Sequence, residues 1–386
     1  MKIAMDGSLL SGSFSGVEYA ILGLATALSK LQTDSEILLY VGKNFACPNL
    51  PAGSVKLRRA AGAGKCRLRR ILWQHTSLPV CLKAEKVDVF HGPGYVLPMW
   101  GGTASVVTVY DIIALTHPGL CTKANAAHYR RVLPRSVRRA ELVIVPTAAV
   151  ANQVSEHLGI SRGKICVVPC GIDARFAPAS EKDVRSLRAE WKLPERFVLF
   201  VGNLEPKKNL TALVQAFFAA KMNKKLPHKL VLVGMPGWQY KPVLKEIEHL
   251  GMARDVIMPG YVPRELLPVL YSAAEMFAFP SLVEGFGLPP LEAMACGTPV
   301  IVSRDPALLE TTGGAAFDAD ASDLRSLREA IERLAERQEL RQELAERGRR
   351  RAAEFNWMRA ARETMDVYCE ALQRAKNRIR PEDLLQ

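Results

Sequence analysis

The chain has 386 residues, of which 48% are hydrophobic and 24% are charged, and its formal net charge at pH 7 is +13. This length suits two globular domains better than a single core, and the composition excludes a disordered or disulfide-stapled class of protein. No uninterrupted apolar stretch is long enough to predict a membrane span, and the first residues lack the pattern of a signal peptide, so we expect a cytoplasmic protein.

The positive charge is concentrated in the first part of the chain. Residues 1–170 hold 20 Lys and Arg against 9 Asp and Glu, a balance of +11, whereas the remaining 216 residues hold 32 against 30, a balance of +2. A basic half favours an acidic partner such as nucleic acid, anionic lipid or a phosphorylated ligand. Two clusters stand out: seven basic residues within 56–70 (KLRRAAGAGKCRLRR), and Arg130, Arg131, Arg135, Arg138 and Arg139. Neither has interleaved aromatic residues or a nucleic-acid-binding motif, so a basic nucleic-acid-binding protein is only an alternative, and we expect no nucleic-acid partner.

Short runs rich in Val and Ile alternate with helical patterns twice along the chain. The first round predicts strands at 2–6, 36–41, 87–91, 105–110 and 141–146, and helices at 17–30, 67–84, 124–139 and 148–158. The second predicts strands at 197–202, 229–234, 255–260, 276–280 and 298–303, and helices at 208–222, 241–251, 264–274, 289–296 and 306–311. Such runs are typical of parallel strands covered on both faces. The sequence therefore predicts an α/β protein with two doubly wound, Rossmann-like parallel-sheet domains facing a shared cleft.

The segment 281–303 (SLVEGFGLPPLEAMACGTPVIVS) places two acidic residues, Glu284 and Glu292, around a glycine turn. Its glycines allow a tight turn and close approach of a ligand, and the Pro-Pro pair suits the first turn of a helix. We expect that helix to run from about Leu288 to Ala295, with its amino end favouring a negatively charged ligand group. Carboxylates accept hydrogen bonds from neighbouring sugar hydroxyls. The segment thus predicts a ligand with phosphates between two sugar rings; a hydrolase using the two carboxylates as acid and base is an alternative.

Two further segments bear on phosphate binding. NLEPKKNL (203–210) follows a predicted strand and places Lys208 at a helix start, where a cation and free N–H groups can hold a diphosphate. The Gly-Ser loop within DGSLLSGSFSG (6–16) also opens a helix, but it does not match GxGxxG, which weakens a dinucleotide interpretation.

These segments carry a resemblance to a known family. FVGNLEPKKNL, VEGFGLPPLEAMACGTPVIVS and VVPCGIDARFAP resemble glycosyltransferase family 4, the retaining nucleotide-sugar enzymes of GT-B fold. VDVFHGPGYVLP, SVVTVYDIIALTHP and LVIVPT are similar to its first-domain signatures, so the likeness covers nearly the whole chain. The resemblance implies an acceptor-binding domain at 1–175, a nucleotide-sugar-binding domain at 190–355, and a final helix within 356–386 that crosses back to the first domain.

The resemblance also implies roles for individual residues. Glu284 would bind hydroxyls of the donor sugar, Glu292 the ribose hydroxyls, and Lys208 the diphosphate. The remaining donor-binding positions would act largely through their backbone: Gly285, Phe286, Gly287 and Leu288 near sugar and phosphate, Tyr261 and Val262 at the base, and Gly16 beneath the phosphate and acceptor.

This chain departs from the family pattern at two places. Many members have arginine where this chain has Asn203, and His-Asp where it has Tyr110 and Asp111. Tyr110 can still donate a hydrogen bond near the transferred sugar, but it is not a cation at neutral pH. Together with Glu284 and Lys208, Tyr110 and Asp111 complete the candidate catalytic set.

The resemblance implies retaining transfer of a hexose, mannose being favoured and GDP-mannose the favoured donor, to a glycan or lipid-linked acceptor in lipopolysaccharide or other surface polysaccharide synthesis. A sugar-nucleotide epimerase or a phosphorylase of the same fold is the alternative. We expect neither a metal nor another cofactor. The basic residues Arg58, Arg59, Arg67, Arg69 and Arg70, near Leu72 and Trp73, further predict docking on an anionic membrane surface, placing the protein peripherally on the inner face of the cytoplasmic membrane.

Overall fold

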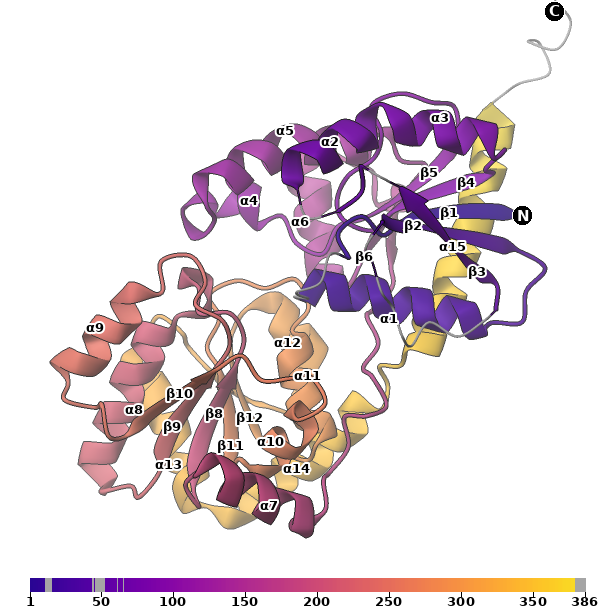
Figure 1. Ribbon diagram of the computed structural model, residues 1–386. Coiled ribbons are helices and arrows are strands. Elements are labelled where there is room, and N and C mark those ends of the chain that lie inside the picture. Colours follow the sequence, from indigo (N-terminus) through magenta and orange to yellow (C-terminus); the bar gives the residue numbers. More distant parts are fainter. Residues whose placement is uncertain (11–15, 44, 46–52, 61, 65, 379–386) are drawn as a thin grey trace, which may run out of the picture. The chain divides into compact units, whose positions relative to one another are not determined.

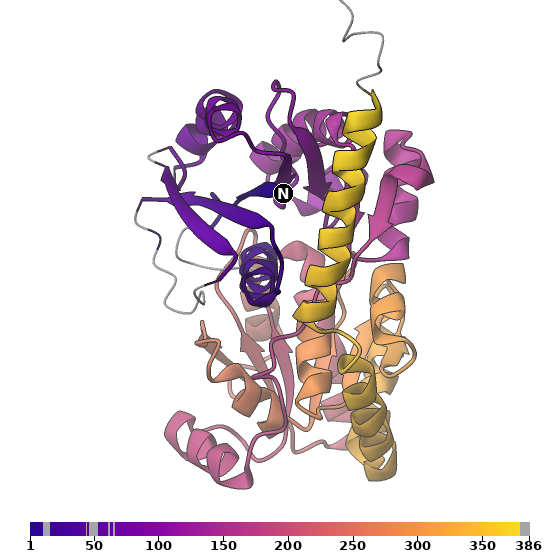
Figure 2. The same ribbon diagram turned by 90° about the vertical axis from the view of Figure 1, so that its right-hand side faces the viewer.

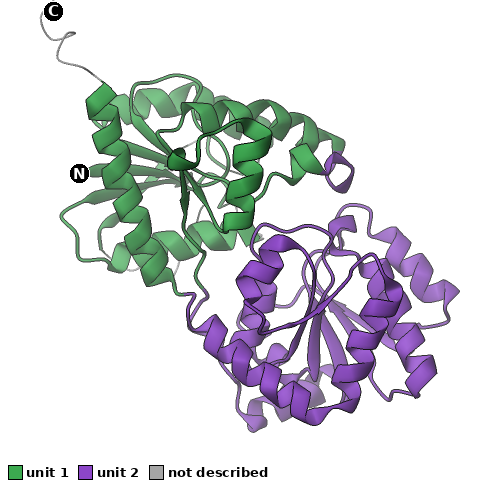
Figure 3. Ribbon diagram, turned by 180° about the vertical axis from the view of Figure 1, so that it is seen from behind, with its two compact units in different colours: residues 1–116, 123–171, 356–386 green, residues 117–122, 172–355 purple. Residues whose placement is uncertain are grey.

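The computed structural model describes residues 1–10, 16–43, 45, 53–60, 62–64 and 66–378 (Figures 1 and 2). The chain forms two compact units (Figure 3): unit 1 comprises residues 1–116, 123–171 and 356–386, and unit 2 comprises residues 117–122 and 172–355. The N–H of Ile172 donates a hydrogen bond to the carbonyl of Phe355, over 3.0 Å. The two ends of the long segment of unit 2 therefore lie side by side.

Unit 1 is built on a seven-stranded sheet in which every strand pairs in parallel with its neighbour, in the order β3-β2-β1-β4-β5-β6-β7. Its strands are β1 (Lys2–Asp6), β2 (Glu36–Gly42), β3 (Val55–Ala60), β4 (Val89–Gly92), β5 (Ala104–Thr108), β6 (Leu142–Val145) and β7 (Ile165–Val167). The strand order reverses between β1 and β4, which is where ligands bind in open sheets of this kind.

Helices cover both faces of this sheet. They are α1 (Gly16–Lys30), α2 (Arg67–His75), α3 (Ser77–Ala84), α4 (Ile113–Thr116), α5 (Lys123–Arg139), α6 (Ala148–Leu158) and α15 (Trp357–Arg378). Side chains alternate along each strand, so Ile3 and Met5 join a core with α1 and α15, while Ala4 joins a core with α2, α3, α5 and α6. Helix α15, the long yellow helix in Figure 2, thus supplies part of the core of unit 1 from the far end of the chain.

One buried polar contact ties α15 to the sheet. The imidazole of His91, in β4, is fully buried and lies within hydrogen-bond distance (2.7 Å) of both the Tyr368 hydroxyl of α15 and the Thr108 hydroxyl of β5. Burial lowers the pKa of His91 to about 3, so the ring is neutral at physiological pH. His91 is therefore a neutral structural link between β4, β5 and α15.

Unit 2 has a six-stranded parallel sheet in the order β10-β9-β8-β11-β12-β13. Its strands are β8 (Phe197–Val201), β9 (Lys229–Val233), β10 (Val256–Gly260), β11 (Met276–Phe279), β12 (Val300–Ser303) and β13 (Phe317–Ala319). Its helices are α7 (Glu181–Trp191), α8 (Leu210–Lys224), α9 (Lys241–His249), α10 (Leu267–Ala273), α11 (Leu288–Ala295), α12 (Pro306–Thr312), α13 (Leu324–Glu336) and α14 (Gln338–Ala352). The order reverses between β8 and β11, so the predicted phosphate loop and the glycine turn follow the two strands that flank the reversal.

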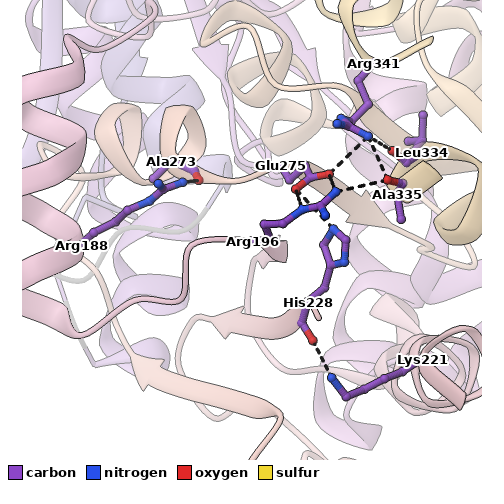
Figure 4. A network of polar contacts seen from close by, with 9 residues as sticks. All are labelled: Arg188, Arg196, Lys221, His228, Ala273, Glu275, Leu334, Ala335 and Arg341. Carbon is purple, nitrogen blue, oxygen red and sulfur yellow. Dashed lines mark hydrogen bonds and ion pairs between the residues drawn. The ribbon is translucent and has the colours of Figure 1, made fainter. Parts of the chain in front are cut away.

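The amino ends of these strands are joined by an ion-pair network centred on Glu275 (Figure 4). Its carboxylate receives two hydrogen bonds from Arg196, at 2.6 and 2.8 Å, and lies 3.3 Å from both Arg341 and His228. Although burial would raise the pKa of Glu275, the hydrogen bonds from Arg196 and the nearby His228 and Arg341 bring it down to about 2. The network fixes the edge of the sheet opposite to the glycine turn.

The structure corrects several element boundaries. The predicted helix at 67–84 is two helices, α2 and α3, that break at Thr76. Strands β3, β7 and β13 were not predicted, and the predicted helix beginning at 208 is a short 3-10 turn (Pro206–Lys208) followed by α8. Strand β3 lies within the basic cluster at 56–70 and at the edge of its sheet. A sheet edge tolerates charged residues, so the VKLRRA sequence of this strand lacks the apolar run that predicts a buried strand.

Candidate donor-sugar site

The glycine turn after β11 has the backbone geometry that its sequence requires. Gly287 has φ of 95° at the N-cap of α11, a conformation that favours glycine. A Cβ at this position would lie 2.5 Å from Cδ2 of Leu308, so a larger residue is also excluded by packing. Two prolines occupy the first turn of α11, as predicted. The amino end of a helix is thereby presented at the carboxyl edge of the sheet, where it favours a negatively charged group.

Lys208 and Glu284 form a buried ion pair. The Lys208 ammonium lies 2.5 Å from a Glu284 carboxylate oxygen and 4.4 Å from the centroid of the Phe279 ring. Burial lowers the pKa of Lys208, and the Glu284 carboxylate opposes that effect. Burial would likewise raise the pKa of Glu284, but the charges of Lys208 and Lys207 bring it below its ordinary value. The pair brings together the loop after β8 and the loop after β11, two segments that the sequence placed at one site.

Glu292 is held by two residues that the sequence analysis did not single out. Its carboxylate pairs with the Arg264 guanidinium at 2.9 Å and accepts a hydrogen bond from the Tyr271 hydroxyl at 3.2 Å. The residue is only 4% exposed, and burial raises its pKa, an effect that Arg264 opposes. Arg264 also lies over the Phe176 ring, 4.9 Å from its centroid. Arg264 and Tyr271 therefore fix the orientation of the Glu292 carboxylate.

The loops at this edge of unit 2 are joined by backbone hydrogen bonds. Gly202 donates to Val233, Gly234 donates to Gly260, each over 2.9 Å, and Leu282 donates to Lys207 over 2.8 Å. The loops after β8, β9, β10 and β11 consequently form one connected surface.

The backbone positions predicted to bind the donor lie on these loops. Tyr261, after β10, is more than half exposed, whereas Val262 is buried. The Phe286 side chain is buried edge-on against Phe355, with ring centroids 5.6 Å apart, so a role in binding would belong to its backbone. Asn203 lies on the loop after β8, where its amide donates to Glu205 over 3.4 Å.

Asp305 and Ser303 support the glycine turn from the next strand. The Asp305 carboxylate caps α12 by accepting hydrogen bonds from Ala307 and Leu308, and its other oxygen lies 3.4 Å from the Glu284 N–H. The Ser303 hydroxyl donates to the carbonyl of Ser281 over 2.5 Å. Both residues therefore fix the backbone that carries Glu284. The Asp-Pro sequence at 305–306 is a helix-start signal that could have located this support.

The remaining predicted residues lie in unit 1. Tyr110 and Asp111 follow β5, and Gly16 is the first residue of α1. The Tyr110 ring packs edge-on against Tyr95, with centroids 5.8 Å apart, and the Tyr95 hydroxyl donates to Asp111 over 3.3 Å. Asp111 also accepts from the Ile113 N–H at the start of α4. Tyr110 and Asp111 are thus fixed at the carboxyl edge of the unit 1 sheet.

Within the described ranges, no three or more His, Cys, Asp or Glu side chains gather as a metal site. Among the helices of the same ranges, none is both long and apolar enough to span a membrane.

Two family models match the chain. The model described as Glycosyltransferase Family 4 matches residues 14–176, and that described as Glycosyl transferases group 1 matches residues 183–351. The chain belongs to glycosyltransferase family 4. Each unit of this glycosyltransferase corresponds largely to one model, and the predicted family is confirmed.

Curated relatives of this glycosyltransferase include two mannosyltransferases of Escherichia coli. It is 29% identical over 288 residues to the O-antigen chain mannosyltransferase B of Escherichia coli, a match that covers 74% of this chain and 75% of that protein. It is also 29% identical over 240 residues to the serotype-specific mannosyltransferase WbdA of Escherichia coli, covering 61% of this chain. The matched region is 29% of the length of WbdA, so that protein is much longer than the segment they share.

Solved structures confirm the GT-B fold. Sucrose-phosphate synthase from Thermosynechococcus elongatus matches with a TM-score of 0.75 at 21% identity, covering 96% of this chain and 98% of that one. Anabaena HepE, solved in complex with UDP-glucose, matches with a TM-score of 0.74 at 20% identity. The match covers 96% of this chain and 100% of that one. At these identities the two structures support the fold alone.

Proposed function

We propose that this glycosyltransferase transfers a mannose-like hexose from a nucleoside-diphosphate sugar, GDP-mannose being the favoured donor, to a glycan or lipid-linked acceptor in surface polysaccharide synthesis, with retention of anomeric configuration. The observation that carries the proposal is the Lys208–Glu284 pair beside the amino end of α11. The choice of sugar is supported by the mannosyltransferase names of the two Escherichia coli relatives, and the O-antigen chain named for one of them supports surface polysaccharide synthesis.

Lys208 can serve two partners at once. An ammonium has three hydrogen-bond donors, so Lys208 can keep its contact with Glu284 and still donate to a diphosphate oxygen. The amino end of α11 adds N–H groups and a favourable dipole for the same negative charge. These groups would stabilise the leaving diphosphate as the bond to the anomeric carbon breaks.

Glu284 would orient the sugar rather than act as a nucleophile. One of its oxygens is engaged by Lys208, and the carboxylate can accept hydrogen bonds from sugar hydroxyls. In this mechanism the acceptor oxygen bonds to the anomeric carbon on the face that the diphosphate leaves, and the acceptor proton passes to a diphosphate oxygen. The chain's contribution is positioning and electrostatic stabilisation.

The donor base is tested by titrating GDP, UDP, ADP and CMP, each with and without Mg²⁺, in calorimetry and thermal-shift assays. A ligand that binds only the folded state raises the apparent melting temperature. We expect selective stabilisation by GDP that does not require Mg²⁺. If another nucleotide alone stabilises the protein, the choice of GDP-mannose is wrong; if none does, the transferase proposal itself is contradicted.

Glu292→Ala and Glu292→Gln locate the nucleotide response. Each removes the negative charge proposed to hold the ribose. We expect the affinity for GDP to fall about tenfold or more. Glu275→Ala is the matched control, because it also removes a carboxylate paired with arginines in unit 2, at the opposite edge of the sheet. A full GDP response in the Glu292 variants would contradict the assigned site.

A further inference from the structure

A cavity of about 450 Å³ lies at the β13 edge of the unit 2 sheet. Its walls come from β13, from the two helices that follow it, α13 and α14, and from the end of β12. Small-molecule sites in proteins have volumes of about 300–1,000 Å³, so the cavity is large enough for a metabolite. None of the residues that line it belongs to the candidate donor-sugar site, which makes it a second cavity of the same unit.

Three guanidinium groups line the cavity, and they come from three different elements. Arg304 directly follows β12, Arg333 lies in α13 and Arg347 lies in α14. A guanidinium has five N–H donors in a planar fork, which matches the oxygens of a phosphate group. Three such groups around one cavity therefore favour a phosphorylated ligand.

Two of these arginines are only partly engaged by the protein. The Arg304 Nε–H donates to the Asp318 carboxylate over 3.0 Å. The Arg347 guanidinium donates to Glu343 over 3.0 Å and to the carbonyl of Gly314. Since each guanidinium has five donors, most of them remain available to a ligand.

Arg333 is the least engaged of the three. Its guanidinium lies 5.9 Å from the centroid of the Phe317 ring in β13. In the part of the chain that the structure describes, no carboxylate forms an ion pair with it. The positive charge of Arg333 is therefore available to a ligand in the cavity.

The rest of the wall complements a sugar. Asp318 and Glu329 line the cavity, and each is held by an arginine through one carboxylate oxygen. The second oxygen of each can accept a hydrogen bond from a sugar hydroxyl, and the Ser326 hydroxyl can donate one. Leu340 and Leu344 of α14 add apolar surface for the C–H groups of a sugar ring.

We propose that this cavity is a regulatory site for a sugar phosphate. The guanidinium groups would bind the phosphate oxygens, and the carboxylates of Asp318 and Glu329 would accept hydrogen bonds from the hydroxyls. Neither half of such a ligand would use the whole wall, because inorganic phosphate offers nothing to the leucines and a free sugar offers nothing to the arginines.

Arg304 connects the cavity to the support of Glu284. It stands between Ser303, whose hydroxyl donates to the carbonyl of Ser281, and Asp305, whose carboxylate lies 3.4 Å from the Glu284 N–H. A ligand bound to Arg304 would therefore act on the segment that fixes the Glu284 backbone. Its binding should change the affinity for GDP, and GDP should change the affinity for the ligand by the same factor. This regulatory role rests on the proposed function.

Calorimetry on the full chain with mannose 6-phosphate tests the cavity as a binding site. We expect mannose 6-phosphate to bind about tenfold or more tightly than inorganic phosphate or mannose, because it alone uses the basic, acidic and apolar parts of the wall. No binding, or binding no tighter than that of inorganic phosphate, would overturn the proposal.

Arg333→Gln/Arg347→Gln locates the binding. A hydrogen bond to a charged group contributes about tenfold or more to affinity, so this variant should bind mannose 6-phosphate about a hundredfold more weakly. The matched control, Arg337→Gln/Arg350→Gln, removes two exposed arginines from the start and the end of α14 that do not line the cavity, and it should bind as the unmodified protein does. Equal weakening in both variants would indicate binding by surface charge in general and would contradict the cavity as the site.

Ala316→Leu tests the same cavity without changing its charge. Ala316 lines the cavity, so a larger apolar side chain there should occupy part of the space and weaken the binding of mannose 6-phosphate. Thermal unfolding without ligand shows whether each variant is folded. A folded Ala316→Leu variant that binds as tightly as the unmodified protein would contradict a ligand inside the cavity.

The regulatory role is tested by titrating GDP with and without saturating mannose 6-phosphate. We expect the affinity for GDP to change about fivefold or more, with the same factor in the reverse titration. An unchanged affinity would overturn the regulatory role. A protein that binds mannose 6-phosphate but not GDP would contradict the proposed function and with it the regulatory role, but not the cavity, so the two failures are distinguishable.

Discussion

Lys208 and Glu284 are each stable in the interior because the other is present. Removing one partner of a buried pair leaves an uncompensated charge, which costs about 3–5 kcal/mol. Lys208→Met should therefore destabilise the protein by about that amount at pH 7, whereas Lys208→Met/Glu284→Gln should be less destabilised than Lys208→Met alone. Urea unfolding of wild type, both single variants and the double variant measures the difference.

The pair would have no structural importance if the double variant were destabilised by the sum of the two single costs. A matched exposed pair provides the comparison. Arg325 and Glu329 lie 2.8 Å apart on the surface of α13, and the same cycle on them should give a far smaller coupling than the cycle on Lys208 and Glu284.

Glu275 makes the stability of unit 2 sensitive to acid. Its pKa is about 2 in the folded protein against an ordinary value of 4.5. Because the folded pKa is the lower one, the contribution is fully present above about pH 4.5 and is lost as pH falls toward 2. A shift of this size corresponds to about 3 kcal/mol. Glu275→Gln should accordingly lose about that much stability at pH 7 and progressively less below pH 4.5, which urea unfolding at several pH values checks.

The control for this prediction is Glu329→Gln, whose carboxylate pairs on the surface of α13. Glu329→Gln should change the free energy of unfolding far less than Glu275→Gln does at pH 7, and without a marked dependence on pH. A pH-independent cost for Glu275→Gln would show that the carboxylate contributes through shape and not through its charge.

At the scale of the elements, α1 and α15 pack too closely for a side chain at Gly23. A Cβ there would lie 2.3 Å from Cε2 of Trp357, an atom of a rigid ring. Gly23→Ala should destabilise the protein by about 1–3 kcal/mol through overpacking, even though alanine favours a helix. Trp357→Leu should cost less in the Gly23→Ala background than in wild type, because it removes the clash. Thermal unfolding of the four proteins tests this, and strictly additive costs would contradict it.

The sequence predicted most central strands, because buried parallel strands are short, nearly continuous apolar runs such as FVLFV at 197–201. It did not predict β3, β7 and β13, which lie at or near sheet edges and have mixed burial. The loop ends carrying Lys208 and Glu284 could be predicted because each follows a recognisable strand. Arg264 and Tyr271 could not, since only the fold brings them to Glu292, although Arg264 closely follows the Tyr261–Val262 segment assigned to the base.

At the scale of the whole molecule, the core of unit 1 depends on a helix from the end of the chain. Ala361, Val367 and Tyr368 of α15 are buried in that core beside α1. A chain ending at Phe355 should therefore lose the folded structure of unit 1, while unit 2, whose sheet is complete, should remain folded and keep the GDP response. Limited proteolysis with mass spectrometry should show early cleavage within residues 1–171. Protection of that region equal to the full chain would contradict the prediction.

The hydrogen bond between Ile172 and Phe355 has a consequence for biosynthesis. It places the beginning and the end of the long segment of unit 2 together, so that this segment can close on itself as soon as it has left the ribosome. Most of unit 1 is translated before that segment, but unit 1 must wait for α15, which is made after it, before its core is complete. Domains usually fold in the order of their synthesis. In this protein the order should be reversed, and the nascent amino-terminal region would need protection from aggregation until α15 has emerged from the ribosome.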